Sequence, residues 1–209
     1  MGKEFLLFVC FLSMLSFTVA QNTDLEDELR RVYESDQRYR VKLIDFLKND
    51  QIDSVAHYTE LMKIADLENQ KIVFDILEKQ GWPEGLSQRA NKAIFFVIDH
   101  AEINDQKKYL SYLKKQSEAG IIDKDKYPIV LDRILVSEQK RQIYGTQTKM
   151  IIKDDAKVVY IYPVEDYKNI DSLRSTVGLL PLELYMKILE SALNSKVLYD
   201  DNLSLQNTH

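Results

Sequence analysis

The chain has 209 residues, a formal net charge of −5 and a hydrophobic content of 45%. This length and composition favour one globular domain with a sizeable core. The acidic balance argues against nucleic acid as a partner, because nucleic-acid-binding domains normally carry a basic stripe. Lysine pairs such as Lys107-Lys108 are interleaved with acidic residues, which indicates a solvated helix face instead.

The first twenty residues have the three-part plan of a secretory signal peptide. A lysine precedes an apolar run from Phe5 to Phe17, and Thr18 and Ala20 occupy the −3 and −1 positions of the expected cleavage point. The run is shorter than the ~20 residues of a membrane-spanning helix. We therefore expect cleavage after Ala20, no stable membrane span afterwards, and a periplasmic or secreted protein. An uncleaved anchor is the alternative, because Glu4 weakens the positive start.

Cys10 is the only cysteine, and it lies inside the apolar run. A lipoprotein attachment cysteine would stand at the end of such a run, so this reading is rejected. Cleavage leaves a mature chain without cysteine, which excludes disulfides, thiolate metal sites and cysteine nucleophiles. The fold then depends on its apolar core.

Apolar residues recur at helical spacing over the first two thirds of the mature chain. The first segment, residues 24–46, forms one long helix or two, and further helices are expected at about 53–79, 87–101, 104–119 and 125–142. Gly81 and Pro83 end the second of these segments. Asn104 is a suitable N-cap for the fourth, which stops before Gly120.

The period of the pattern changes after Gly145. Residues 146–152 and 157–162 alternate like two strands around Asp154-Asp155, which predicts a β-hairpin. A short helix at 171–177 and a last helix from Pro181 to about Leu193 follow. The predicted fold class is therefore mainly α: a signal peptide over 1–20, then a single helical domain over 21–209 with one small β-hairpin.

His100 lies near the end of a strongly patterned helix in "FFVIDHAEIND". A structural role is natural there, because the helix dipole favours a cation at the C-terminus. The functional alternative is a general base or a hydrogen-bonding anchor in a pocket. His57 is far away in the sequence, and the HExxH motif is missing. We therefore expect no metal and no cofactor.

Charged residues also stand close to apolar helix faces. Arg133, beside Asp132, is expected at the edge of the core, where a guanidinium needs a carboxylate or several carbonyls. The structural interpretation is a salt bridge between helices. The functional interpretation is that the guanidinium binds an anionic ligand. Similar charged residues near apolar faces are Asp36, Arg40, Glu165, Asp166 and Arg174.

The stretch "RQIYGTQ" joins the fifth helix to the hairpin. Gly145 is consistent with a positive φ or a close backbone approach. Tyr144, Thr146 and Gln147 offer hydrogen-bonding groups that suit either a polar ligand or the connection of a helix end to a strand. None of the motifs GxSxG, GxGxxG, SxxK or the Walker loop surrounds it.

Five ordered stretches carry a family resemblance: "SDQRYR", "GWPEG", "FFVIDHAEINDQKKYL", "LDRILVSEQKRQIYGTQ" and "YPVEDYKNIDSLRSTVGLLPL". Together they resemble an uncharacterised bacterial family, mostly secreted or periplasmic, with the blocks D-Q-x-x-R, G-W-P, a Q-H-like pair, D-R…Q-x-Y-G-T-Q and R-x-x-x-G-L. The match runs from about Asp36 to Tyr185, with Asp99 in place of the glutamine expected before His100. The resemblance implies a helical domain without an established activity. It marks, without assigning roles, Asp36, Arg40, Trp82, His100, Asp132, Arg133, Tyr144, Gly145, Thr146, Gln147 and Arg174.

These observations leave three hypotheses for the function. The first is a cell-envelope or secreted binding module that holds a polar small molecule or a peptide in a cleft lined by His100, Asp132, Arg133 and residues 144–147. The second is a hydrolase with His100 as general base and Arg133 or the Gly145 backbone stabilising an anion. The third is a structural protein whose polar blocks are buried salt bridges and caps.

Overall fold

The computed structural model describes residues 23–43, 45–46, 52–153 and 156–205. The chain forms two compact units divided between Ala101 and Glu102, called here the N-terminal unit and the C-terminal unit. Each is described by itself. The single domain expected from the chain length stays a prediction, because this division does not say whether either unit folds alone.

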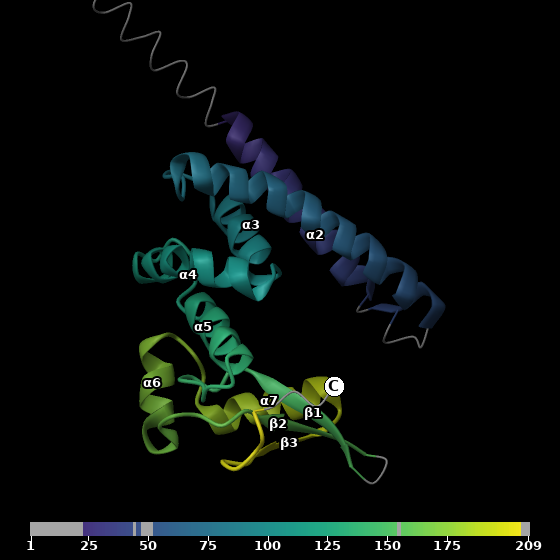
Figure 1. The fold of residues 1–209 in the computed structure, drawn as a ribbon, viewed down its shortest axis with the longest axis vertical. Coiled ribbons are helices and arrows are strands. Elements are labelled where there is room, and N and C mark those ends of the chain that lie inside the picture. Colours follow the sequence, from purple (N-terminus) through teal and green to yellow (C-terminus); the bar gives the residue numbers. More distant parts are fainter. Residues whose placement is uncertain (1–22, 44, 47–51, 154–155, 206–209) are drawn as a thin grey trace, which may run out of the picture. The chain divides into compact units, whose positions relative to one another are not determined.

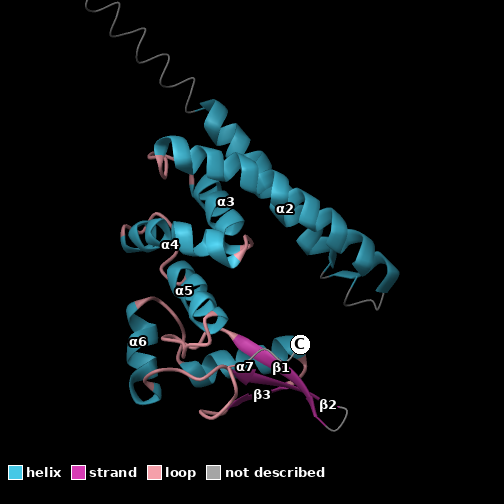
Figure 2. Ribbon diagram, in the orientation of Figure 1, coloured by secondary structure: helices cyan, strands magenta, loops and turns pink. Residues whose placement is uncertain are grey.

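The N-terminal unit is built from helices (Figures 1 and 2). Residues 23–43 and 45–46 are helical and run beside α2 (Ile52–Gln80), and α3 (Gln88–Asp99) packs against α2. The helical spacing of the apolar residues puts one face of each helix into a shared core. That core contains Leu29, Val32, Val73, Leu77, Ala90, Ile94, Val97 and Ile98, all at most 3% exposed.

The G-W-P block forms the corner between α2 and α3. Gly81 has φ 72°, and its N–H donates to the carbonyl of Leu77 at 3.0 Å, which ends α2. The indole N–H of Trp82 donates to Oδ1 of Asn91 at 2.7 Å, and Ser87 caps α3 by accepting from the N–H of Ala90 at 3.2 Å. This block therefore has a structural role.

The C-terminal unit combines helices with a small sheet. Its elements are α4 (Ile103–Glu118), α5 (Lys126–Ser137), β1 (Thr148–Lys153), β2 (Ala156–Ile161), the 3₁₀ turn η1 (Tyr167–Asn169), α6 (Ile170–Thr176), α7 (Leu182–Leu193) and β3 (Lys196–Tyr199). The sheet order is β1-β2-β3, with β1 antiparallel and β3 parallel to β2. Helix α7 packs on the sheet over a core of Val159, Ile161, Val164, Ile170, Leu182 and Val197.

The mainly α fold class is confirmed, and so are the hairpin and most helix positions. Asp154 and Asp155 lie outside the described residues. Helix α4 begins at Ile103 with Glu102 as its N-cap, so the prediction of Asn104 as the cap was wrong. The predicted hairpin gains a third strand, β3, that the sequence analysis missed.

Helix α5 ends at Ser137, five residues before the predicted end at Gln142. Gln139 has φ 57°, and the N–H of Lys140 donates to the carbonyl of Leu135 at 2.9 Å. This left-handed residue closes the helix without a glycine. Gln142 instead forms a parallel bridge with Val164.

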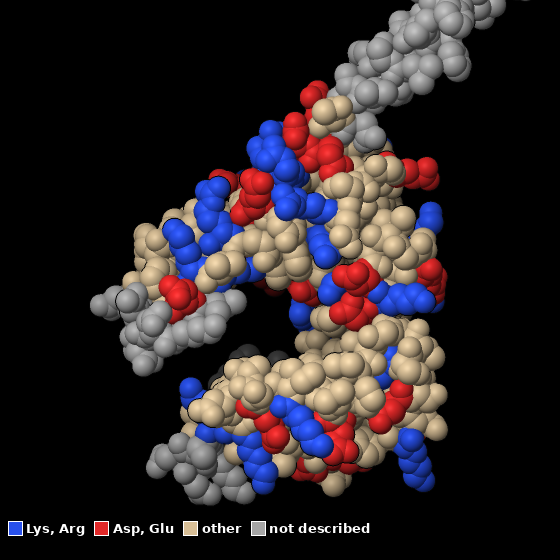
Figure 3. Space-filling model, turned by 180° about the vertical axis from the view of Figure 1, so that it is seen from behind, with Lys and Arg blue, Asp and Glu red and all other residues tan. Residues whose placement is uncertain are grey.

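The expected signal peptide, residues 1–20, lies outside the described part of the chain. Within the described part, no helix is both long enough and apolar enough to cross a membrane. On the face seen in Figure 3, lysine and arginine side chains are interspersed with aspartate and glutamate over both units.

Gly145 provides a test of how tightly the joint between α5 and β1 is packed. Its φ is +67°, and a Cβ added there would lie 3.2 Å from Cγ1 of Val164 and 3.3 Å from Cδ1 of Leu182. Gly145→Ala should therefore combine the cost of a left-handed backbone, about 1 kcal/mol, with crowding of about 1–3 kcal/mol. Urea denaturation of the full chain measures the sum.

Gly120→Ala is the matched control, because Gly120 has φ +71° and an added Cβ would meet no atom within 4 Å. It should show only the backbone cost. Equal losses of stability in the two variants would show that Val164 and Leu182 move aside freely.

Candidate functional site

The structure distributes the residues singled out in the sequence over both units. The N-terminal unit brings together Asp36, Arg40 and His100. The C-terminal unit contains the others, namely Asp132, Arg133, Tyr144, Gly145, Thr146, Gln147 and Arg174.

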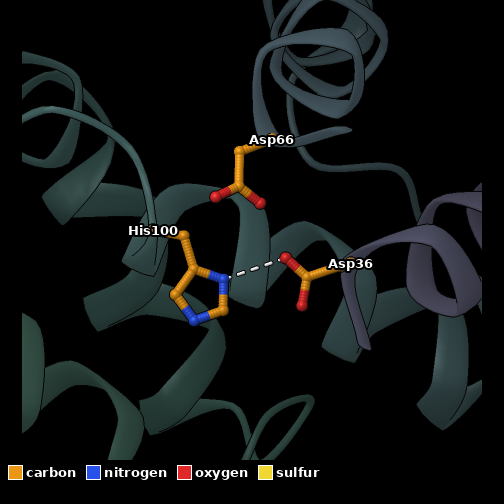
Figure 4. Close-up of side chains that lie close together, drawn as sticks. All are labelled: Asp36, Asp66 and His100. Carbon is orange, nitrogen blue, oxygen red and sulfur yellow. Dashed lines mark hydrogen bonds and ion pairs between the residues drawn. The ribbon is translucent and has the colours of Figure 1, made fainter. Parts of the chain in front are cut away.

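A buried aspartate holds the ring of His100. Asp36 is 1% exposed, and its Oδ1 lies 2.9 Å from Nδ1 of His100 (Figure 4). Because an ionised carboxylate only accepts hydrogen bonds, Nδ1 carries the proton in a neutral ring and Nε2 keeps its lone pair. The His100 side chain is 24% exposed, and Nε2 lies 3.8 Å from Asp99 Oδ2, beyond hydrogen-bonding distance. Nε2 is therefore the nitrogen available to an outside molecule.

The ring position follows from the end of α3. His100 is the C-cap of that helix, and its backbone N–H donates to the carbonyl of Phe96 at 2.9 Å. The two rings are nearly parallel, with centroids 5.8 Å apart. The sequence suggested two roles for His100, a structural one at a helix end and a functional one as a base or hydrogen-bonding anchor. The structure is compatible with both.

Arg40 neutralises the charge around Asp36. Its two terminal nitrogens donate to the two oxygens of Asp66, each at 2.9 Å, and Nη1 lies 3.2 Å from Oδ1 of Asp36. Nη1 also donates to the Asp36 backbone carbonyl, and Gln37 donates to Asp36 Oδ2 at 2.7 Å. Two carboxylates with one guanidinium leave one net negative charge beside the ring of His100.

Asp66 is the member of this cluster that the sequence analysis missed. It lies on α2 beside Ala65, in a stretch that otherwise reads as an ordinary amphipathic helix. The only signal in the sequence was an acidic residue next to an apolar face, which many surface helices share. Its pairing with Arg40 connects residues 26 positions apart and needs the helical hairpin to be known.

Asp36, Asp66 and His100 each offer one ligand atom, and these atoms lie within 4.8 Å of one another. Two carboxylates and one imidazole are a donor set that suits zinc and other transition metals. The sequence offered no sign of it, because the three residues come from three helices. Arg40 hydrogen-bonds to Asp66 and lies within 3.2 Å of Asp36, so a metal ion would have to displace the guanidinium.

Asp132 organises the loop after α5. The residue is fully buried, and its carboxylate accepts from the backbone N–H groups of Ile143, Tyr144 and Thr146 and from the Thr146 hydroxyl, at 2.9–3.2 Å. Burial raises the pKa of Asp132, while these hydrogen bonds act to lower it. All the bonds come from the protein itself, so Asp132 holds the loop.

Arg174 secures the same loop from α6. It is 1% exposed and donates to the carbonyls of Leu180 and Tyr144, both at 2.5 Å, and to that of Gly145 at 3.3 Å. Its guanidinium also lies over the ring of Tyr185, 4.9 Å from the centroid. Burial lowers the pKa of Arg174. Its hydrogen bonds therefore serve to hold the backbone of residues 144, 145 and 180 in place.

Two glutamines complete the joint with the sheet. The amide of Gln142 donates to the carbonyls of Tyr162 and Gln147 at 2.8 and 3.1 Å, and its Oε1 accepts from the Gln147 N–H at 2.6 Å. The amide of Gln147 donates to the carbonyl of Ile129 at 3.1 Å. Arg133 lies partly buried on α5. The stretch "RQIYGTQ" is thus largely a structural joint, whose polar groups bond mainly to other parts of the C-terminal unit.

A family model matches residues 23–198 of the chain. The chain belongs to the family of unknown function DUF6624. Comparison with curated proteins and comparison with solved structures each gave no match.

Arg40→Ala tests whether the guanidinium occupies the place of a cation in this DUF6624 chain. The change leaves two carboxylates without their partner and should lower the free energy of unfolding by about 3 kcal/mol. Zinc should then raise the melting temperature of the variant, because Asp36, Asp66 and His100 can bind it, and should leave the wild type unchanged. Differential scanning fluorimetry with and without zinc measures both effects.

Arg38→Ala is the control, because Arg38 is an exposed arginine on the same helix. It should change neither stability nor the response to zinc. An equal response of wild type and Arg40→Ala would contradict the competition, and no response in Arg40→Ala would exclude the cluster as a zinc site.

Proposed function

We propose that the N-terminal unit is an acid–base site of a hydrolase, in which Nε2 of His100 takes a proton from a water molecule or a polar substrate. The observation that carries the proposal is the 2.9 Å contact between Nδ1 of His100 and the buried carboxylate of Asp36, on a ring that is itself partly exposed. An imidazole fixed in one tautomer by a buried carboxylate is the arrangement that general-base catalysis requires.

The chemistry follows from the charges in the cluster. Asp36 holds the ring so that Nε2 presents its lone pair, and the carboxylate stabilises the imidazolium formed when Nε2 takes a proton. Within the described residues, no hydroxyl side chain hydrogen-bonds to His100. Water is therefore the nucleophile that we assign, with Nε2 removing its proton as it attacks.

Binding without chemistry is the second candidate, and Asn69 favours it. This residue lies one helical turn from Asp66 on α2, is 3% exposed, and its Nδ2 has no hydrogen-bond partner in the described part of the structure. A buried unpaired donor costs about 1–3 kcal/mol. A polar ligand with an acceptor oxygen would offset that cost, as a binding module for small polar molecules requires.

His100→Asn separates these candidates from a purely structural role. The asparagine amide can keep the donor to Asp36 but removes the base at Nε2. The variant should keep the wild-type melting temperature and lose at least about 100-fold in turnover. Turnover is measured on p-nitrophenyl acetate, p-nitrophenyl butyrate and p-nitrophenyl phosphate with the full mature chain.

Two further variants complete the experiment. His57→Ala, which changes a histidine on α2, should leave turnover unchanged. Asp36→Asn should also lower turnover, though less than His100→Asn, because the base remains but its wrong tautomer is favoured. Turnover that survives in His100→Asn, or the absence of turnover in the wild type, would contradict the hydrolase.

Binding without chemistry is tested by mass spectrometry of molecules that co-purify with the wild type but not with His100→Asn.

We also propose that the protein works in the periplasm or as a secreted protein, because residues 1–20 have the pattern of a cleavable signal peptide. Expression of the full chain in an exporting bacterial host should give a product that begins at Gln21, as measured by intact-mass spectrometry. Ala20→Lys should block this cleavage, because the −1 position requires a small residue. A wild-type product that keeps residues 1–20 would contradict the proposal.

A further inference from the structure

The C-terminal unit contains a cavity that is independent of the His100 site. Its volume is about 340 Å³, near the lower end of the range for small-molecule sites, which is about 300–1,000 Å³. The walls come from the end of α4, the beginning of α5, the end of α6 and the loop after α5. The lining includes Lys114, Glu118, Lys124, Tyr127, Tyr144 and Thr176.

Two phenol groups in this lining lack a hydrogen-bond partner within the described residues. Among the described residues, the hydroxyls of Tyr127 and Tyr144 make no hydrogen bond, although both side chains are partly buried. Burial raises the pKa of both phenols, so they stay protonated at neutral pH. A protonated phenol offers one O–H donor. The cavity therefore holds two free donors.

The loop holds Tyr144 in position for this role. Its backbone N–H donates to Asp132, and its carbonyl accepts from Arg174 at 2.5 Å. The polar side chains of Gln142 and Thr146 are used within the joint. The hydroxyl of Tyr144 therefore stays available to a ligand. The backbone of this residue is held by the buried side chains of Asp132 and Arg174. A donor that is already ordered loses little entropy on binding.

The charges around the cavity favour a negative ligand. In the described part of the chain, the Lys124 ammonium has no ion-pair partner. Lys114 lies 4.0 Å from Glu118 in an exposed pair, which contributes little. The lining presents two ammonium groups and two phenol donors against the carboxylate of Glu118. The charge of the nearby Asp132 also raises the pKa of both phenols, but that carboxylate already accepts hydrogen bonds from the backbone N–H groups of Ile143, Tyr144 and Thr146. Hydrogen-bond donors therefore predominate around the cavity.

We infer that this cavity binds a small anion with a carboxylate or phosphate group, held by the hydroxyls of Tyr127 and Tyr144 and by the ammonium of Lys124. The rings of the two tyrosines provide the apolar walls for the rest of the ligand. The carboxylate of Glu118 repels negative charge and so disfavours anions of high charge. The inference uses residues 114–177 alone and does not depend on His100.

Isothermal titration of the full mature chain with inorganic phosphate, phenyl phosphate and benzoate tests the inference. At least one probe should bind with a dissociation constant of about 1 mM or lower. Tyr127→Phe and Tyr144→Phe should each weaken binding about tenfold, because each removes one hydrogen bond to a charged group. Their melting temperatures should equal that of the wild type, because neither hydroxyl makes a hydrogen bond to another described residue.

The controls distinguish the site from unspecific anion binding. Tyr160→Phe, a change on β2, and His100→Asn should both bind like the wild type. Glu118→Gln should tighten binding, since it removes the opposing charge. The preferred probe identifies the group: benzoate indicates a carboxylate and phosphate a phosphoryl group. No binding by any probe, unchanged affinity in both phenylalanine variants, or weaker binding in Glu118→Gln would overturn the inference.

Discussion

Each unit of this chain depends on one buried aspartate whose negative charge has to be met inside the protein. A carboxylate removed from water without partners is so unfavourable that the surrounding residues must supply donors or cations. Asp132 is surrounded by three backbone N–H groups and a hydroxyl, and Asp36 by an arginine, a histidine and a glutamine amide. Asp132 is thus compensated mainly by backbone groups, whereas Asp36 is compensated by side chains.

At Asp132 the charge is compensated by backbone N–H groups, and these hydrogen bonds fix a loop. Amide groups neither titrate near neutral pH nor leave the site, so Asp132 and the carbonyl-binding Arg174 together define one conformation of residues 143–147. At Asp36 the charge is compensated by side chains, one of which is an imidazole. An imidazole differs from a backbone amide because it has a second nitrogen and can change its charge. The same need to compensate a buried charge thus produces a structural joint in one unit and a candidate proton acceptor in the other.

Much of the fold could be predicted from the sequence, because apolar periodicity and the positions of glycine and proline determine where most helices begin and end. The failures have tertiary causes. The four residues of β3 carry little pattern of their own, and they are a strand because β2 offers a parallel partner. Helix α5 ends early because Gln139 takes a left-handed backbone conformation and Gln142 pairs with Val164, which no local propensity indicates.

The candidate site was less predictable for a related reason. Asp36, Arg40 and His100 stood out by residue type, but Asp66 joins them only through the packing of two helices. Asp132 and Thr146 looked like ligand-binding residues because they are polar, and the structure turns both toward the protein's own backbone. The sequence shows which side chains can donate or accept hydrogen bonds. Only the fold shows whether each one bonds to the protein itself or is open to a ligand.

The parallel pairing of β3 with β2 also has a consequence for how the protein is made. Val197 belongs to the core of the C-terminal unit, and Val158 pairs with Lys196, its distant partner in the chain. The core of this unit therefore stays incomplete while the ribosome is still adding residues 196–199. Contacts between segments so far apart in sequence also form slowly. Until then one edge of β2 has unpaired backbone groups that another strand could bind.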